Sequence, residues 1–196
     1  MAAPITTPMT AEEFFDWANR PENAGRRLEL NAGEVEEMPS PGEAHALVCW
    51  LVIKLLTEYV VRRGRGHLLT NDCGLIVRRG PDTVRGPDVM LFLDDLTLQQ
   101  ARRGHTDRTP PLVVEVMSPS DTLPKIGRRV GQYLDRGAGL VWVVDPDLRA
   151  VYVHKPDEYM KVFDGDDELT GNGVLPDFSC RVADLFTLPG QPPATS

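Results

Sequence analysis

The feature that most restricts the fold of this chain is a nearly continuous apolar run at residues 111–117, in which Glu115 is the single charged residue. A strand with this pattern is buried on both faces, so other elements must cover it on both sides. A second buried run, residues 140–144, follows after helix-start signals at Ser118 and a stop at Gly137. This order of strand, helix and strand predicts an α/β domain with helices packed on a central sheet.

The flanking sequence predicts further helices and hairpins around this centre. Thr10 and Glu13 have the spacing of a capping box, which predicts a helix start. Apolar residues at helical spacing predict the longest helix over residues 43–63, and Asp94 is expected to cap a short helix to about residue 102. Strands are predicted at residues 67–70, 74–79 and 88–92, and hairpins at residues 26–39 and 151–163, before an acidic loop at 165–168 and a closing segment at 182–186.

The 196 residues suffice for one domain with a substantial core. We expect one α/β domain over residues 10–188, with a mixed central β-sheet flanked by α-helices, β-hairpins near both ends, and a disordered tail at 189–196. No stretch is predicted to span a membrane, since the best candidate, residues 47–56, is short and interrupted by Lys54. The first ten residues lack the pattern of a signal peptide, which predicts a cytoplasmic protein.

Cysteine usage agrees with a reducing compartment. The three cysteines, Cys49, Cys73 and Cys180, are odd in number and far apart in the sequence, without a CxxC pair or a Cys/His cluster. This spacing argues against both a disulfide framework and a structural zinc site.

The net charge of -8 is unusual for a protein that binds nucleic acid, because contacts with phosphate need Lys and Arg. The charge is unevenly distributed, however. Residues 43–136 hold 14 Lys and Arg against 11 Asp and Glu, so the acidic excess lies in the flanks. Three basic clusters, Arg62-Arg63 with Arg65, Arg78-Arg79 and Arg102-Arg103, are candidates for contact with a phosphate backbone, although such clusters are more often solvated surfaces.

Two acids stand out because their neighbours are apolar. Asp88 begins a predicted strand after Gly86-Pro87, and Glu115 lies inside the buried run. A carboxylate in a buried strand is costly unless it is paired or bound to a metal. Two such carboxylates on adjacent strands can meet at a strand end and hold a hard cation such as Mg²⁺. The alternative is that Glu115 pairs with an arginine and Asp88 belongs to a turn.

The motifs RGPDVM, PPLVVEVMSPSDT, YLDRG and LVWVVDP occur in this order. Together they resemble the Uma-type restriction endonucleases of the PD-(D/E)XK nuclease superfamily. The resemblance extends to RLELNAGEVEEMPSPGEAH near the start and LPDFSCRVADLF near the end, so that it covers about residues 10–186. It implies a restriction-endonuclease-like fold and a metal-dependent nuclease.

The resemblance also implies roles for individual residues. Asp88 corresponds to the aspartate of the PD motif and Glu115 to the acid of the E-x-K motif, with a backbone carbonyl near Val116 as a further metal ligand. The third position of the E-x-K motif is Met117 instead of lysine. In the family a lysine of the following helix supplies the cation, near the position of Arg129 here. Arginine does not release a proton, so Lys125, one helical turn earlier, is an alternative source of the cation.

Three further residues match the family pattern. Glu29, in the first hairpin, corresponds to an acid that can reach the metal, but it could equally face solvent. His45 corresponds to a histidine that could orient Glu29 or touch phosphate, and the alternative is a structural histidine. Tyr133, one turn beyond Arg129, could line the cleft or belong to the core.

These observations lead to a hypothesis of a Mg²⁺- or Mn²⁺-dependent endonuclease that cleaves DNA, with Asp88, Glu115, Lys125 and Arg129 as its catalytic residues. A homodimer suits the cleavage of two strands. A nuclease fold that has lost catalysis and serves in binding or regulation is the alternative, and a metal-dependent hydrolase of another ester is a third. The chain has no P-loop, GxGxxG, HExxH or GxSxG motif to support other classes of enzyme.

Overall fold

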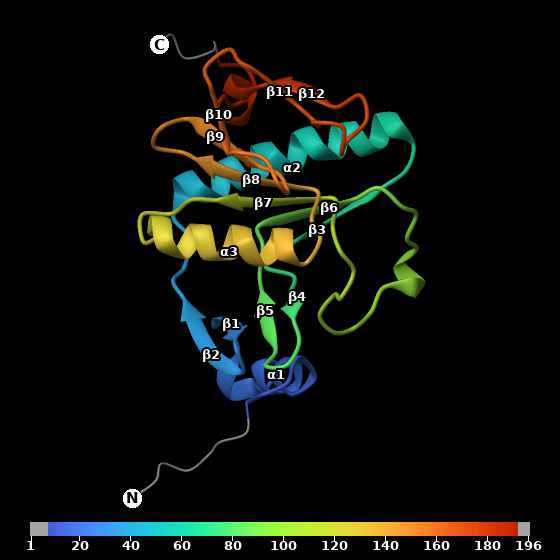
Figure 1. Ribbon diagram of the computed structural model, residues 1–196, viewed down its shortest axis with the longest axis vertical. Coiled ribbons are helices and arrows are strands. Elements are labelled where there is room, and N and C mark those ends of the chain that lie inside the picture. Colours follow the sequence, from blue (N-terminus) through green and yellow to red (C-terminus); the bar gives the residue numbers. More distant parts are fainter. Residues whose placement is uncertain (1–7, 192–196) are drawn as a thin grey trace, which may run out of the picture.

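The computed structural model describes residues 8–191 and is built around a six-stranded sheet (Figure 1). Strands β7 and β8 are parallel neighbours at its centre, and each other neighbouring pair is antiparallel. The mixed α/β architecture agrees with the sequence prediction. In spatial order the strands are β10 (Lys161–Asp164), β9 (Ala150–His154), β8 (Leu140–Asp145), β7 (Leu112–Val116), β6 (Val89–Phe92) and β3 (His67–Thr70).

Two helices cover the opposite faces of this sheet, with the central strands between them in Figure 1. Helix α2 (Glu43–Arg63) buries Val52 and Leu56 against a cluster that includes Trp142. Helix α3 (Leu123–Asp135) packs Val130 on the other face, against side chains that alternate with those of the first cluster along β7 and β8. The burial of every residue of β7 and β8 follows from this double cover.

The helix between the two buried strands begins later than predicted. Thr122 is its N-cap and Pro124 lies in the first turn, whereas the sequence predicted a start in Ser118–Asp121. Ser118 and Asp121 form a separate turn, in which the backbone N–H of Ser118 donates to the Asp121 carboxylate at 2.8 Å. The helix ends before Gly137, whose φ of 103° suits glycine at a helix C-terminus.

The N-terminal hairpin does not join the central sheet. Strands β1 (Arg27–Asn31) and β2 (Glu34–Met38) form a second sheet with β5 (Thr83–Arg85) and β4 (Leu75–Arg78), in the order β2-β1-β5-β4. Helix α1 (Ala11–Ala18) covers it through Phe14, and the predicted capping box of Thr10 and Glu13 is present. Strand β5 was missed because the turn signals of Pro81 and Asp82 precede it directly.

The prediction of a helix from Asp94 to about residue 102 was wrong. Residues 94–102 contain only a short 3₁₀ turn, η2 (Leu98–Gln100), with Thr97 as its cap. Leu98 is 92% exposed there, so no apolar face holds a longer helix on the domain. Near the C-terminus, the acidic loop leads into a two-stranded sheet of β11 (Glu168–Thr170) and β12 (Ser179–Arg181). The remaining 3₁₀ turns are η1 (Pro21–Asn23) and η3 (Val182–Leu185).

Helix α2 corrects the expectation that no segment is long or apolar enough to span a membrane. It has 21 residues, and its most apolar window has a mean hydropathy of 1.6. One face of the helix is buried against the sheet, as in the core helix of a folded domain. Residues 192–196 of the predicted tail, and the first seven residues, lie outside the described part of the chain.

Candidate active site

The antiparallel pairing of β6 with β7 brings Asp88 and Glu115 together. Val89 pairs with Val114, and the same register continued by one residue sets Asp88 opposite Glu115. Beyond the last paired residues, the Asp88 side chain takes the place of a backbone acceptor, because its Oδ2 accepts a hydrogen bond from the backbone N–H of Val116 at 2.8 Å. Both carboxylates line one cavity at the strand ends, together with His45 and Arg129, among others.

Glu115 is buried and asymmetrically bonded. Its Oε1 accepts hydrogen bonds from Arg129 Nη1, at 3.1 Å, and from the hydroxyl of Tyr133. No donor within residues 8–191 contacts its Oε2. Burial raises the pKa of Glu115 to about 7, although the positive charge of Arg129 opposes the shift. The site therefore contains a carboxylate whose charge is only partly compensated.

The raised pKa of Glu115 predicts that the stability of the metal-free protein depends on pH. Between the ordinary pKa of 4.5 and the folded pKa of about 7, the folded protein retains a proton that the unfolded chain has lost. The contribution of this group to the unfolding free energy should fall as pH rises through that window. Urea unfolding of wild type and of Glu115→Gln, measured at several pH values across this range, gives the part of the unfolding free energy that depends on the titration of Glu115. A difference between the two proteins that does not change with pH would contradict the assignment.

Arg129 lies between two carboxylates. Besides Glu115, it contacts Glu29, with 2.7 Å between Nη2 and Oε1. Burial disfavours the charge of Arg129, but the two carboxylates raise the net pKa of its guanidinium. The side chain is 12% exposed. Arg129 is therefore held in place by the protein and neutralises charge at the site.

Glu29 is buried, and the alternative of a solvent-facing hairpin residue was wrong. Its Oε1 accepts bonds from Arg129 and from the backbone N–H of Gly86, while its Oε2 accepts a bond from Arg85 at 2.9 Å. Arg85 was missed at the sequence level, because an arginine in a turn-rich stretch carries no signal of burial. Its side chain is 3% exposed. It also contacts Glu36, Asn31 and Gln132.

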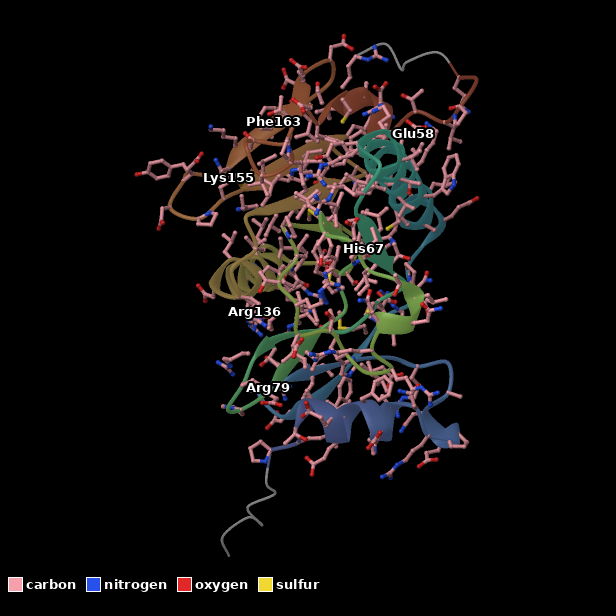
Figure 2. The ribbon with its side chains drawn as sticks, turned by 90° about the vertical axis from the view of Figure 1, so that its right-hand side faces the viewer. Glu58, His67, Arg79, Arg136, Lys155 and Phe163 are labelled. Carbon is pink, nitrogen blue, oxygen red and sulfur yellow. The ribbon has the colours of Figure 1, made fainter. Side chains whose placement is uncertain are left out.

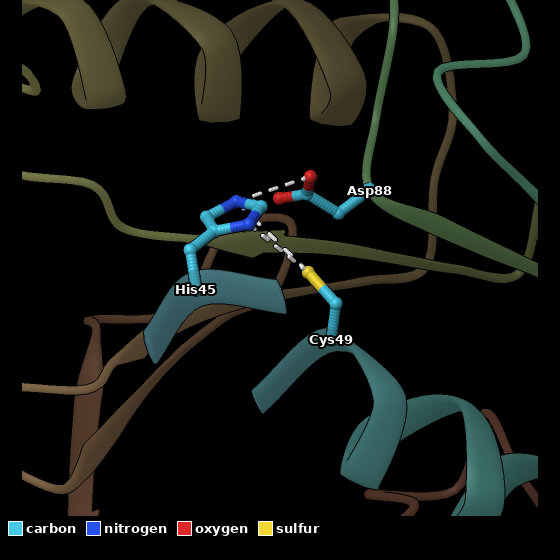
Figure 3. Close-up of side chains that lie close together, drawn as sticks. All are labelled: His45, Cys49 and Asp88. Atoms are coloured by element: carbon cyan, nitrogen blue, oxygen red, sulfur yellow. Dashed lines mark hydrogen bonds and ion pairs between the residues drawn. The ribbon is translucent and has the colours of Figure 1, made fainter. Parts of the chain in front are cut away.

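His45 contacts Asp88 and not Glu29, the residue that the sequence suggested it might orient. Its Nε2 lies 3.3 Å from Asp88 Oδ1, and the pKa of the imidazole is raised by its hydrogen bond with that carboxylate (Figure 3). Its Nδ1 lies 3.5 Å from the Sγ of Cys49, one helical turn further along α2. The prediction that the chain has no Cys/His cluster was therefore wrong. The spacing of four residues on one helix was the available signal.

The other predicted residues fall into two groups. Tyr133 is fully buried in the core while its hydroxyl bonds to Glu115. It is therefore both a core residue and a residue of the site, the two alternatives that the sequence offered. Lys125 is exposed and lines an adjoining cavity with Glu29, Arg128 and Arg129, among others. Within the described residues, no ion pair or hydrogen bond engages the Lys125 ammonium group. Lys125 is thus the more available cation, and Arg129 is the one that touches the carboxylates.

In two of the predicted basic clusters, one arginine pairs with carboxylates of the domain. Arg79 lies beside α1 near one end of the molecule (Figure 2), where it contacts both Glu12 and Asp82 at 2.7 Å. Arg102 contacts Asp107, also at 2.7 Å. These pairs give the arginines partners within the domain, so their use in binding nucleic acid remains a prediction.

Similarity to known proteins extends over most of the chain. A family model with the description "Uma2: Putative restriction endonuclease" matches residues 11–183. A crystal structure described as "a putative nuclease belonging to DUF820 from Anabaena variabilis ATCC 29413" is similar with a TM-score of 0.71 and 20% identity, covering 91% of this chain and 98% of that one. Comparison with curated proteins found no match. The structural similarity confirms the predicted fold class.

Proposed function

The chain belongs to the Uma2 family, described as putative restriction endonucleases, and on this basis we propose that it hydrolyses DNA phosphodiester bonds with the help of Mg²⁺ or Mn²⁺. Membership of the family confirms the resemblance seen in the sequence motifs and supports a nuclease in general terms. The observation that carries the finer proposal is the pair of carboxylates, Asp88 and Glu115, opposite each other in one cavity.

The donor set at this position fits a hard cation. Carboxylate oxygens are the ligands that Mg²⁺ prefers, and Glu115 Oε2 has no donor among residues 8–191. The carbonyl of Val116 is a third candidate ligand, because the N–H and C=O of a strand residue point to the same side, and the Val116 N–H points to Asp88. We propose that Asp88, Glu115 and Val116 hold the cation.

A bound divalent cation would lower the pKa of water and stabilise charge on a phosphate. The protein's own groups prepare the site for this chemistry. Arg129 and Tyr133 bond to Oε1 of Glu115, and its other oxygen has no donor among residues 8–191. His45 and the Val116 N–H hold the two oxygens of Asp88. Lys125, exposed at the adjoining cavity, is the cation that we propose contacts the substrate phosphate.

The proposed role of Lys125 predicts that Lys125→Ala lowers metal-dependent cleavage about a hundredfold, the order of effect of losing one donor to transition-state charge. Thermal stability should remain near that of wild type, because the side chain is exposed. Lys161→Ala, on the far edge strand β10, is a matched control that should cleave like wild type. Equal cleavage by Lys125→Ala and wild type would contradict this role and leave Arg129 as the cation that stabilises the charge of the phosphate.

The proposed activity is tested by incubating the purified protein with supercoiled plasmid in Mg²⁺, Mn²⁺ or a chelator. Nicking that needs the metal is the expected result, and single-stranded DNA and RNA in parallel give the class of substrate. If none of these is cleaved, the hydrolytic proposal fails.

A homodimer is the assembly that we propose for double-strand cleavage, and light scattering would test it.

The second candidate function is a binding module on a catalytically inactive nuclease fold. It is favoured by Arg129, whose guanidinium is held by Glu29 and Glu115 and cannot transfer a proton. This module would bind DNA without cleaving it, and its affinity would fall steeply as salt concentration rises. Binding measurements at several salt concentrations, on the same preparation, separate it from the nuclease.

A further inference from the structure

The Asp88 carboxylate faces two different sets of donors. On one side it shares a cavity with Glu115. On the other side it lines a second cavity with His45 and Cys49, among others. The two carboxylates of the first set are hard oxygen donors, whereas the second set adds the sulfur of Cys49 beside the imidazole of His45, which lines both cavities. Soft and borderline donors of the second kind select Zn²⁺ over Mg²⁺.

We propose that His45, Cys49 and Asp88 form a site for Zn²⁺ or a similar borderline transition ion, and that an ion bound there withholds Asp88 from the Mg²⁺ site. The consequence for cleavage rests on the proposed nuclease function, whereas the binding itself does not. Figure 3 shows the three side chains pointing toward one another, two from α2 and one from the residue just before β6.

The distances between the three ligand atoms suit a tetrahedral ion. Bonds of about 2.0–2.3 Å place adjacent ligand atoms roughly 3.3–3.7 Å apart in a tetrahedral site. His45 Nε2 lies 3.3 Å from Asp88 Oδ1 and 3.9 Å from Cys49 Sγ. All three ligand atoms lie within 4.8 Å of one another. Small side-chain rotations would therefore bring all three to bonding distance.

The surroundings of the cluster favour this use. His45 and Cys49 are one turn apart on a rigid helix, so the backbone already sets their spacing. The cavity gives access to an ion and to a water molecule as fourth ligand, as in zinc sites with three protein ligands. The nearby Arg27 is neutralised by two hydrogen bonds to Asp72, at 3.0 and 2.6 Å, which limits its repulsion of a cation.

Charge balance supports the same assignment. Binding removes the proton from the Cys49 thiol and requires a neutral His45 imidazole with its proton on Nδ1, and the displaced protons pass to solvent. The thiolate and the Asp88 carboxylate then neutralise the two charges of Zn²⁺. The apparent affinity should therefore rise with pH.

Binding is tested directly with Co²⁺, which reports on its ligands by absorbance. The full-length wild-type protein should bind one ion with the near-ultraviolet charge-transfer absorption of a cobalt–thiolate bond. Cys49→Ser should lose this absorption and weaken Zn²⁺ binding by more than about a hundredfold, since loss of even an outer-shell partner costs 10–100-fold. Cys180→Ser, a conservative change at a cysteine on β12, is the matched control and should keep the absorption. Cys49→Ala, checked by circular dichroism, guards against a folding defect in the serine variant.

A second arm measures nicking in Mg²⁺ with added Zn²⁺. Wild type should be inhibited at a Zn²⁺ concentration about a hundredfold lower than that needed for Cys49→Ser. Absence of the cobalt–thiolate absorption in wild type, or its persistence in Cys49→Ser, overturns the site whether or not the protein cleaves DNA. Binding by a protein that cleaves nothing would instead support the site and count against the nuclease.

Discussion

Replacement of Asp88 by asparagine is expected to lower metal-dependent DNA cleavage by about a thousandfold or more, because a divalent cation supplies several kcal/mol of stabilisation to the transition state. The amide keeps the size of the side chain and can still accept the hydrogen bond from the Val116 N–H. It lacks the negative charge that would hold the cation. The loss should therefore appear in metal affinity and in cleavage, with a smaller effect on folding.

A suitable control makes the same chemical change at a comparable place. Asp145 is also a buried aspartate at a strand end, where its Oδ1 accepts hydrogen bonds from the backbone N–H groups of Asp147 and Leu148. Asp145→Asn should nick plasmid and bind Mn²⁺ like wild type. Asp88→Asn, checked to be folded, should be impaired in both assays. Wild-type cleavage by Asp88→Asn would remove the basis of the proposed metal site.

The largest effect on stability is expected at Arg85. Arg85→Leu should lower the unfolding free energy by about 3–5 kcal/mol, the usual loss when one partner of a buried ion pair is removed. The reason is that Glu29, which is 4% exposed, would lose its partner at Oε2. Urea unfolding monitored by circular dichroism gives the value.

Two comparisons test this explanation of the loss. Arg79→Leu removes an arginine of the same sheet region whose side chain is 50% exposed, so its ion pairs should contribute less than about 1 kcal/mol. Adding Glu29→Gln to Arg85→Leu removes the buried negative charge that has lost its partner at Oε2, so the double variant should be more stable than Arg85→Leu alone. If the double variant is no more stable than Arg85→Leu, the loss of unfolding free energy comes from packing instead.

Much of the fold was predictable because its signals are local. The helix at residues 43–63 and the strand at residues 67–70 match α2 and β3. The capping box at Thr10 depends on neighbours three residues apart. Strand β5 and the sheet that it forms with the first hairpin were not predictable in this way. Its three residues follow strong turn signals, and its pairing with β1 joins Leu30 to Val84, far apart in the sequence.

The candidate site shows the same division. The apolar neighbours of Asp88 and Glu115 marked both acids in the sequence, and the antiparallel register of β6 and β7 places them opposite each other. The sequence left open whether Lys125 or Arg129 is the cation of the site. The structure places Arg129 on the two carboxylates, with Lys125 exposed beside them. Their chemical roles remain proposals.

The sequence by itself determined the buried central strands, the helices that cover them and the identity of the two acids, because hydrophobic pattern and capping act over a few residues. The tertiary structure alone decided which charges meet. Arg129 contacts Glu29 across 100 positions of sequence, and Arg85 reaches the same carboxylate across 56. Such contacts depend on how the two sheets and α3 pack together, which no local pattern encodes. The same packing sets His45 against Asp88 and Cys49 beside His45.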